Sequence, residues 1–303
     1  MHPYLRNFID RVNDQKLPCE AAAMLQYGKP AGEYHWIQDV PRNIYSHTKS
    51  FMSTVVGIAI GEGVLSLEDK LTEIFPDKVS PGSDPRVREI TLRHLLTMSS
   101  GWNRPLLMNT DRREGTGMPD YIRYMLSLPL ETNPGTRFEY STADSYLAGC
   151  MAEARLGMTM AAFLYQRVLA PMGIAHPIWE HCPMGHSFGG GGMYMGIRDM
   201  MSLGQLYLQK GRWQGQQLVS EAWVEAASSK QIEIPQLEDI WRCGYGYQFW
   251  ISPYPRSYRA DGAFGQVTTV LPEADAVVAV QCPENGDFPA VRQALHEELL
   301  SRL

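Results

Sequence analysis

The stretch that decides the fold is SHTKSFMSTVVGIAI, residues 46–60, in which a polar tetrapeptide opens a long apolar run. The run is apolar on nearly every side, which predicts a buried helix. Ser46 and Lys49 are three residues apart, so on a helix they lie on one face, one turn from each other. A serine hydroxyl is a weak nucleophile until a neighbouring base takes its proton. A lysine amine can be that base if desolvation lowers its pKa.

Two interpretations of the tetrapeptide are open. In the first, Ser46 caps the helix and Lys49 is a solvated residue of the first turn. In the second, the two residues are a nucleophile and its base. The context favours the second, because a lysine at the start of a buried helix is costly unless it is paired or used. The helix N-terminus also presents N–H groups to Ser46, which suits a developing oxyanion. A covalent serine enzyme is therefore the leading hypothesis.

The composition is typical of a soluble globular protein of one large or two moderate domains. The chain has 303 residues, of which 44% are hydrophobic and 20% are charged. The net charge of −6, without a basic block, argues against nucleic acid as a partner. Five scattered cysteines without a C-x-x-C pair indicate neither a disulfide framework nor a zinc site, so no metal or cofactor is expected. We see neither a signal peptide nor an apolar stretch that could cross a bilayer, and we expect a cytoplasmic protein without a membrane partner.

Strands are predicted near both ends of the chain, and helices fill the middle. Amphipathic helices are expected over 4–14 and from 289 to the C-terminus, and strands over 21–27, 33–40, 244–250, 266–271 and 276–281. The helices predicted between them cover 46–61, 92–98, 119–128, 143–155, 160–169, 197–209 and 220–228, and 188–192 is expected to be a flexible loop. The pattern predicts an α/β (α+β) fold, with an antiparallel sheet built from both chain ends, flanked by the terminal helices, and an inserted, mostly helical lobe.

Residues 1–303 are interpreted as one catalytic unit with two lobes. The α/β lobe is expected to comprise 1–45 and 240–303, and the helical lobe 46–239. Because Ser46 stands where the chain leaves the sheet, a cleft between the lobes is the natural site. The sequence does not indicate an oligomeric state.

Two further segments carry candidate chemistry. Tyr140, in FEYST at 138–142, could relay a proton between the lysine, the nucleophile and the leaving group. Alternatively it is a buried aromatic residue whose hydroxyl binds a backbone carbonyl. The segment ADGAFGQ, residues 260–266, has closely spaced glycines that let a strand edge approach a ligand, and a free N–H there could be an oxyanion donor. The alternative is an ordinary glycine-rich turn before a strand.

Taken together, the order and spacing of these segments resemble the serine β-lactamase and penicillin-binding-protein superfamily. The similarity is to its class C-like branch of esterases, D-aminopeptidases and nylon-oligomer hydrolases. Ser46-His-Thr-Lys49 matches the first motif of the family, and Tyr140-Ser-Thr142 stands where the family has Tyr-x-Asn. The resemblance implies the two-lobed serine β-lactamase fold, with Ser46 as acylated nucleophile, Lys49 as its base and Tyr140 as proton relay. It also implies an oxyanion hole made by the backbone N–H groups of Ser46 and Ala263.

Two departures from the family pattern bear on the substrate. Thr142 replaces an asparagine that in the family contacts the lysine and the substrate amide. The third motif, Lys-Thr-Gly or His-x-Gly in the family, reads Ala260-Asp-Gly262 here, so the cation for a substrate carboxylate is missing unless Arg259 or another residue replaces it. We therefore expect an esterase or amidase acting on a small-molecule acyl substrate, with weak or absent β-lactamase activity. An acyltransferase with the same acyl-enzyme and a non-catalytic, penicillin-binding-like sensor are the alternatives.

Four residues are expected to contact substrate: Thr142, Gly262, Asp144 and Trp102. Asp144 lies one helical turn from Tyr140 and could orient it, or it could equally lie on a solvated helix face. Trp102 could line an acyl pocket or pack in the core. His47 is expected to lie beside the site rather than in it.

Overall fold

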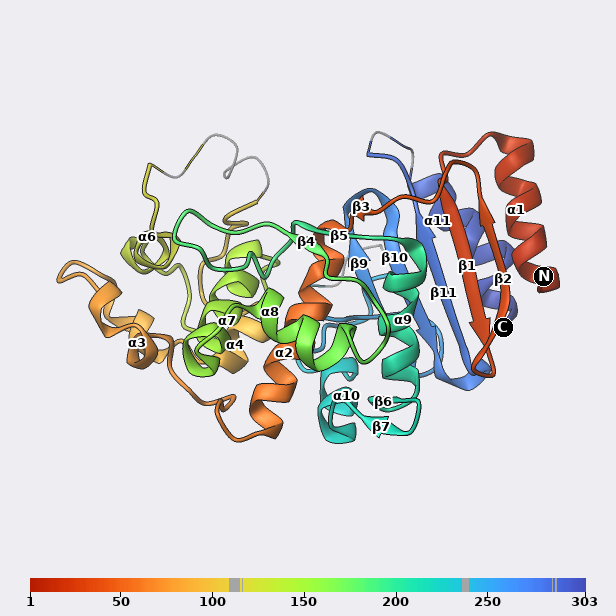
Figure 1. The fold of residues 1–303 in the computed structure, drawn as a ribbon. Coiled ribbons are helices and arrows are strands. Elements are labelled where there is room, and N and C mark those ends of the chain that lie inside the picture. Colours follow the sequence, from red (N-terminus) through yellow and green to blue (C-terminus); the bar gives the residue numbers. More distant parts are fainter. Residues whose placement is uncertain (109–114, 116, 236–239, 285, 287) are drawn as a thin grey trace.

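The computed structural model describes residues 1–303 except 109–114, 116, 236–239, 285 and 287. A sheet with helices on its two faces forms one end of the molecule, and a cluster of helices forms the other (Figure 1). Both chain termini lie beside the sheet, so the two ends of the chain build this lobe together and the middle of the chain builds the helical lobe.

The large sheet has six antiparallel strands in the order β2-β1-β11-β10-β9-β8. The strands are β1 (Ala21–Gln26), β2 (Lys29–His35), β8 (Trp250–Ile251), β9 (Tyr258–Gly262), β10 (Gln266–Leu271) and β11 (Ala276–Gln281). The N-terminal hairpin joins the C-terminal one directly, because Ala21 of β1 pairs with Gln281 of β11. The predicted fold class is therefore confirmed.

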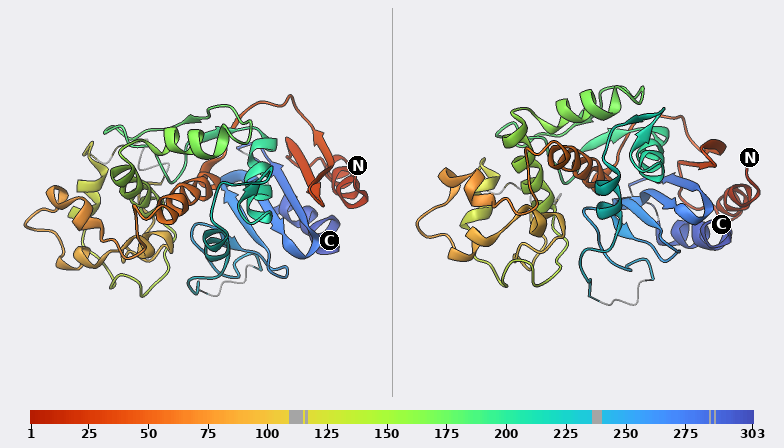
Figure 2. Two further views of the ribbon diagram at one scale, coloured as in Figure 1. Left: turned by 60° about the horizontal axis from the view of Figure 1, so that its bottom comes forward. Right: turned by 90° about the horizontal axis from the view of Figure 1, so that it is seen from below.

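Helices cover the sheet on both faces. The terminal helices α1 (Pro3–Gln15) and α11 (Phe288–Glu298) cover one face, and α9 (Ile197–Leu208) covers the other (Figure 2). Strand β11 is buried throughout, with Val278 facing the terminal helices and Val277 facing α9. Helix α9 approaches closely because Gly204 has no side chain: a Cβ there would lie 2.6 Å from Val277 Cγ1. This helix belongs to the stretch assigned to the helical lobe from the sequence, yet it packs on the sheet.

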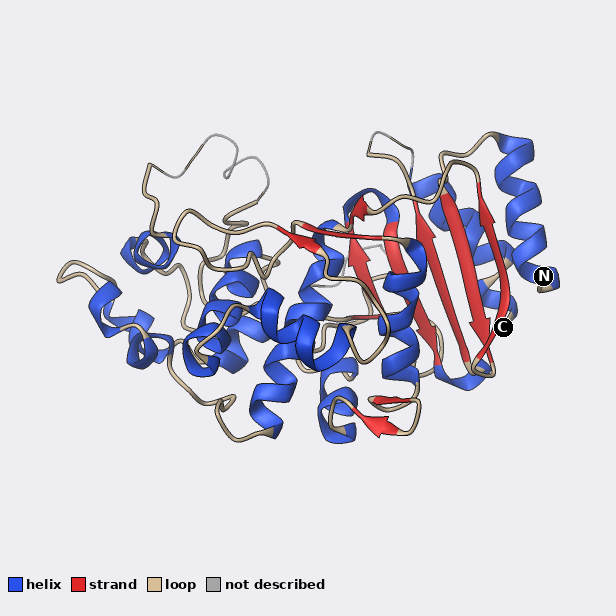
Figure 3. Cartoon of the chain, in the orientation of Figure 1, coloured by secondary structure: helices blue, strands red, loops and turns tan. Residues whose placement is uncertain are grey.

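The helical lobe is built around α2 (Thr48–Gly61), which is buried over almost its whole length. The other helices drawn in Figure 3 are α3 (Leu71–Ile74), α4 (Leu92–Leu96), α6 (Tyr121–Ser127), α7 (Thr142–Leu156), α8 (Met160–Leu164) and α10 (Glu221–Ser228). Helices α7, α8 and α10 contact α2 directly. Five short strands form two further small sheets, in the orders β3-β5-β4 and β6-β7. They are β3 (Arg42–Asn43), β4 (Ile178–Trp179), β5 (Met193–Met195), β6 (Arg212–Trp213) and β7 (Gln216–Gln217).

Three local predictions need correction. The first hairpin turns at Tyr27 and Gly28, both with positive φ, so β2 starts earlier than expected, because a two-residue turn of this kind matches the twist of the strands. The predicted helix over 160–169 becomes π-helical from Tyr165 to Leu169. Of the predicted strand 244–250, only Trp250 belongs to the sheet, and Tyr245 forms isolated bridges.

A search of the described residues finds no single helix long and apolar enough to span a membrane. Among the described helices, one bent pair, Thr142–Leu156 and Met160–Leu169 at 74° to each other, passes that test together.

Candidate active site

Ser46 lies in the single turn η1 (Tyr45–His47), which joins β3 to α2. The turn is strained, because Tyr45 has a φ of 46°, a left-handed conformation that is rare for an aromatic residue. Asn43 stabilises the turn, since its Oδ1 accepts a hydrogen bond of 2.9 Å from the Tyr45 N–H. Backbone strain of this kind concentrates at functional sites, where the surrounding structure holds it in place.

The amine of Lys49 lies next to the hydroxyl of Ser46. It is one helical turn further along, with only 1% of the residue exposed. Its Nζ is 3.1 Å from Ser46 Oγ, 2.6 Å from the carbonyl oxygen of Gly190 and 3.4 Å from Thr142 Oγ1. These three oxygens are uncharged; two belong to side chains and one to the backbone.

Tyr140 reaches the same point from the loop before α7. Its ring centroid is 5.2 Å from Lys49 Nζ, and the ring stacks on Trp250 at 5.4 Å. Burial raises the pKa of the Tyr140 hydroxyl, and a hydrogen bond with the Ser46 side chain offsets part of that rise. Serine, lysine and tyrosine, contributed by two distant segments, thus share one hydrogen-bonding cluster.

The end of β9 lies against the turn that carries Ser46. A Cβ on Gly262 would be 2.2 Å from the carbonyl oxygen of Ile44 and 3.1 Å from the His47 nitrogen, so only glycine fits there. Ala263 follows, at the start of the turn η5 (Ala263–Gly265). The rings of Tyr45 and Phe264, the neighbours of Ser46 and Ala263, contact each other edge to face at 5.1 Å. The turns η1 and η5, which carry Ser46 and Ala263, therefore contact each other.

Thr142 lines the inner side of the cluster, and a glycine segment holds it there. The segment 188–192, expected to be a flexible loop, is buried throughout. A Cβ on Gly190 would lie 2.4 Å from Thr142 Cγ2, so the missing side chain is what lets the Gly190 carbonyl reach Lys49. Sequence reasoning missed this contact, although the run of glycines is a signal of close backbone approach.

Two residues expected to contact substrate have partners inside the helical lobe instead. Asp144 is fully buried, and its Oδ1 accepts a hydrogen bond of 2.8 Å from the hydroxyl of Ser100. Burial raises the pKa of the Asp144 carboxyl to about 8. Trp102 is 1% exposed, and its indole N–H donates to the carbonyl oxygen of Leu128. Both side chains are thus buried, with hydrogen-bond partners in the helical lobe.

His47 and Arg259 also have internal partners. His47 is fully buried beside the site, with Nε2 2.9 Å from Thr268 Oγ1, and burial lowers the pKa of its ring to about 3. Arg259 is 4% exposed; its guanidinium pairs with Asp261 at 2.7 Å and donates to the carbonyl oxygen of Trp241. Arg259 is therefore held within the sheet lobe by internal partners.

A cavity of about 210 Å³ opens beside Tyr140. Its lining residues include Phe138, Tyr140, Ile234 and Arg242. Glu139 and Pro235 also line it, so the cavity has aromatic and aliphatic walls with one acidic and one basic side chain.

One group of side chains in the described part of the chain could hold a metal ion, and it lies away from Ser46. Glu33, His35 and Asp39 place their ligand atoms within 4.8 Å of one another. Glu33 is already bound to Arg198 at 2.8 Å, so a metal ion would have to compete with that ion pair.

The chain belongs to the Beta-lactamase family, whose model matches residues 5–300. It is 30% identical over 152 residues to lovastatin esterase from Penicillium rubens and, over the same length, to esterase EstB from Burkholderia gladioli. These alignments cover 43% and 45% of this chain, but only 37% and 38% of the relatives. The matched stretch thus spans less than two fifths of each relative.

Solved structures agree on the fold over the whole chain. A penicillin-binding protein from Bacillus halodurans matches with a TM-score of 0.74 and 19% identity, covering 97% of this chain and 99% of its own. EstCE1, described as a hydrolase with promiscuous acyltransferase activity, matches with a TM-score of 0.74 and 15% identity over 97% of both chains. The fold is that of the serine β-lactamase-like proteins.

Proposed function

We propose that this protein is a serine hydrolase that cleaves an ester or amide of a small molecule through an acyl-enzyme on Ser46. The observation that carries the proposal is the distance of 3.1 Å between Ser46 Oγ and Lys49 Nζ at the buried head of α2. A nucleophile and a base within hydrogen-bond distance, with a third group beside them, is the arrangement that covalent catalysis requires. The esterase relatives support the same chemistry.

The proposed reaction begins when neutral Lys49 takes the proton of the Ser46 hydroxyl. Ser46 Oγ attacks the substrate carbonyl, and the negative charge on the oxygen is stabilised by the N–H groups of Ser46 and Ala263. Tyr140 is hydrogen-bonded to the Ser46 side chain and lies close to Lys49, so it can pass the proton to the oxygen or nitrogen of the leaving group. The bond between the carbonyl carbon and the leaving group then breaks. A water molecule, losing its proton to the same groups, then attacks the carbonyl carbon of the acyl-enzyme. The bond to Ser46 Oγ breaks, the proton returns to Ser46 and the acid is released.

We propose that the substrate presents no carboxylate to the third-motif segment 258–262. Arg259, the only cation in the third-motif segment 258–262, is bound to Asp261 and the Trp241 carbonyl. β-Lactams depend on such a carboxylate contact in the family this chain resembles. We therefore propose weak or absent β-lactamase activity.

The test is turnover of p-nitrophenyl acetate, labelling by a fluorophosphonate probe and intact-protein mass, measured on the native protein and on Ser46→Ala. We expect turnover, labelling and an acetyl adduct in the native protein and none of them in the variant. Ser127→Ala, which changes an exposed serine bound to the Tyr124 carbonyl, is the matched control and should behave as the native protein. Turnover that survives in Ser46→Ala would refute the proposal, and labelling without turnover would support a sensor.

Acyl transfer is the second candidate, favoured by relatives named acyltransferases, such as calJ of Penicillium decumbens, 25% identical over 159 residues. In this case an alcohol replaces water in the second step, and the acyl group moves to its oxygen. Adding butanol to the p-nitrophenyl acetate assay separates the two candidates, since a transferase would form butyl acetate at the expense of acetate.

We also propose a cytoplasmic location. The support is that all five cysteines are free thiols in the structure, four of them buried. Free thiols are the usual state of cysteine in a reducing compartment.

A further inference from the structure

The ring of Trp250 links Tyr140 to the sheet lobe. Trp250, on β8, is 8% exposed, and the Tyr140 ring stacks on it with 5.4 Å between centroids and 28° between planes. Tyr245 contacts both rings edge to face, at 6.2 Å from Tyr140 and 4.9 Å from Trp250. Aromatic pairs prefer defined relative orientations. The direction of the Tyr140 hydroxyl, which is hydrogen-bonded to Ser46, therefore depends on where the Trp250 ring lies.

The neighbouring strand holds the Trp250 ring through a guanidinium group. Trp250 of β8 pairs with Arg259 of β9, so the two side chains lie on the same face of the sheet. The central carbon of the Arg259 guanidinium lies over the Trp250 ring, 5.7 Å from its centroid, which is a cation–π contact. The guanidinium of Arg242 lies 5.5 Å from the same centroid. Charged groups thus fix the Trp250 ring together with its aromatic neighbours.

Arg259 is itself held by several partners. Its Nε lies 2.7 Å from Asp261 Oδ2, and its Nη1 donates to the carbonyl oxygen of Trp241 at 2.8 Å. Nη1 also donates to Ser252 Oγ at 3.3 Å. A guanidinium presents its donors in a rigid plane, so several bonds at once fix its orientation. A continuous chain of contacts therefore leads from the Asp261–Arg259 pair through a tryptophan ring to the candidate proton relay.

The charges of this chain also act on Tyr140. Burial raises the pKa of its hydroxyl, and the hydrogen bond with Ser46 lowers that pKa. The Asp261 carboxylate raises the pKa further, whereas the positive charges of Arg242 and Arg259 lower it. A group that accepts and donates a proton works best when its pKa is not far above the working pH. The two guanidinium groups therefore favour proton transfer through this hydroxyl.

We propose that Trp250 and Arg259 are positioning residues of the reaction at Ser46, an inference that rests on the proposed serine hydrolase activity. Arg259, fixed by Asp261, holds the Trp250 ring, and that ring holds the Tyr140 hydroxyl where it can transfer a proton to the leaving group. Neither residue needs to touch the substrate. Because Tyr140 acts when the leaving oxygen takes up a proton, a displaced ring should matter most for leaving groups that depart poorly as anions.

The experiment compares kcat/KM for phenyl acetate and p-nitrophenyl acetate, which carry the same acyl group on different leaving groups. This ratio reports the steps up to the acyl-enzyme, so the later hydrolysis of the shared acetyl-enzyme does not enter. p-Nitrophenolate departs readily as an anion, whereas the more basic phenolate oxygen takes up a proton as the carbon–oxygen bond breaks. Trp250→Leu should lower kcat/KM about 10-fold for p-nitrophenyl acetate and about 10²-fold for phenyl acetate. Arg259→Met should lower both values in the same order, by less.

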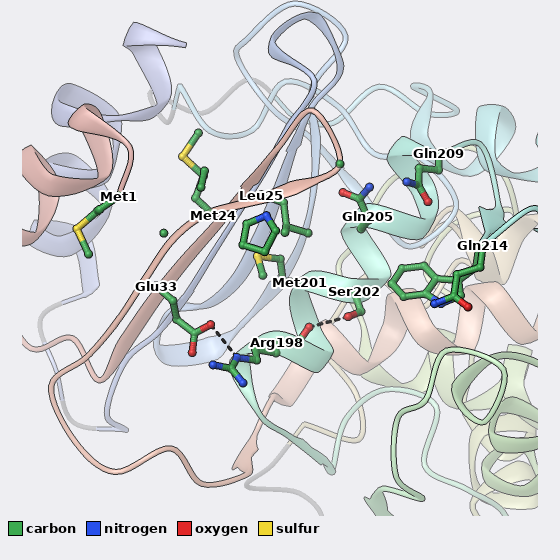
Figure 4. Close-up of a pocket in the computed structure, with 15 residues that line it drawn as sticks. Met1, Met24, Leu25, Glu33, Arg198, Met201, Ser202, Gln205, Gln209 and Gln214 are labelled. Carbon is green, nitrogen blue, oxygen red and sulfur yellow. Dashed lines mark hydrogen bonds and ion pairs between the residues drawn. The ribbon is translucent and has the colours of Figure 1, made fainter.

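The matched control for Arg259→Met is Arg198→Met, which breaks an arginine–carboxylate pair elsewhere on the sheet lobe. Arg198 Nε lies 2.8 Å from Glu33 Oε2, beside a cavity of about 600 Å³ between the β1–β2 hairpin and α9, as Figure 4 shows. This variant should leave kcat/KM for both esters unchanged. Trp250→Phe keeps an aromatic face for Tyr140, so its values should lie between those of the native protein and Trp250→Leu.

A double variant separates positioning from general damage to the fold. Because Trp250 acts through Tyr140, the double variant Tyr140→Phe/Trp250→Leu should cleave phenyl acetate no more slowly than Tyr140→Phe alone. Equal losses on the two esters, or losses that multiply in the double variant, would overturn the inference and leave Ser46 as the nucleophile. Turnover that survives in Ser46→Ala, or no turnover by the native protein, would refute the hydrolase proposal and this inference with it. If Trp250→Leu or Arg259→Met does not fold, the comparison of the two esters with Trp250→Phe decides.

Discussion

The buried carboxyl of Asp144 makes stability depend on pH in a way that Asp144→Asn should abolish. The pKa of this carboxyl is about 8 in the folded protein against the ordinary 3.8, because burial disfavours its charge. The folded protein therefore keeps the proton that the unfolded chain releases. The stability that this difference provides is complete below pH 3.8 and is lost as the pH rises toward about 8.

The size of the effect follows from the shift. Each pH unit between the two pKa values lowers the free energy of unfolding by about 1.4 kcal/mol. Between about pH 5 and about pH 7, this group should therefore lower the stability of the native protein by about 3 kcal/mol. Asparagine resembles the protonated carboxyl and can keep the contact with Ser100. Between about pH 5 and about pH 7, the free energy of unfolding of the variant should therefore rise by about 3 kcal/mol relative to that of the native protein.

The assay is urea unfolding of both proteins across this interval, compared as a difference. The difference is needed because His47, whose pKa is lowered to about 3, contributes with the opposite sign: its stabilisation is present above pH 6.5 and is lost as the pH falls toward 3. Asp10→Asn, on the exposed face of α1, is the control and should follow the native protein. Parallel plots of unfolding free energy against pH for Asp144→Asn and the native protein would refute the reasoning. An effect of the variant on KM without an effect on stability would also refute it.

Three further predictions concern the site. Tyr140→Phe keeps the ring stacked on Trp250 but removes the hydroxyl. We expect kcat for p-nitrophenyl acetate to fall by about 10²-fold or more and the melting temperature to stay the same. An unchanged kcat would exclude Tyr140 as proton relay. Gly262→Ala places a Cβ 2.2 Å from a backbone oxygen, which should displace β9 from Ser46 and lower kcat about 10²-fold. Gly82 has open space around it, so Gly82→Ala should leave kcat unchanged. Equal kcat values of the two variants would contradict the oxyanion assignment. The ring nitrogens of His47 should keep their neutral ¹⁵N shifts down to about pH 4, and titration near pH 6.5 would show that the ring is not buried as described.

The candidate site divides into residues that the sequence brings together and residues that it does not. Ser46 and Lys49 are three residues apart, in the turn η1 and the first turn of α2 that follows it, so local geometry alone places them together. Tyr140 could be proposed only from its place in a motif, since nothing local relates it to Ser46. Asp144 and Trp102, expected to contact substrate, are buried side chains with internal hydrogen-bond partners, and their burial depends on contacts between segments that the sequence does not bring together.

The sequence by itself determined the alternation of strands and helices, and with it the sheet built from both chain ends, because periodicity and turn residues act over a few neighbours. Only the tertiary structure decided that the Gly190 carbonyl meets Lys49 and that Arg259 is held by Asp261. It alone revealed a cavity between the first hairpin and α9. Contacts of this kind join segments far apart in the chain, and they depend on how whole surfaces pack, which no local pattern of residues specifies.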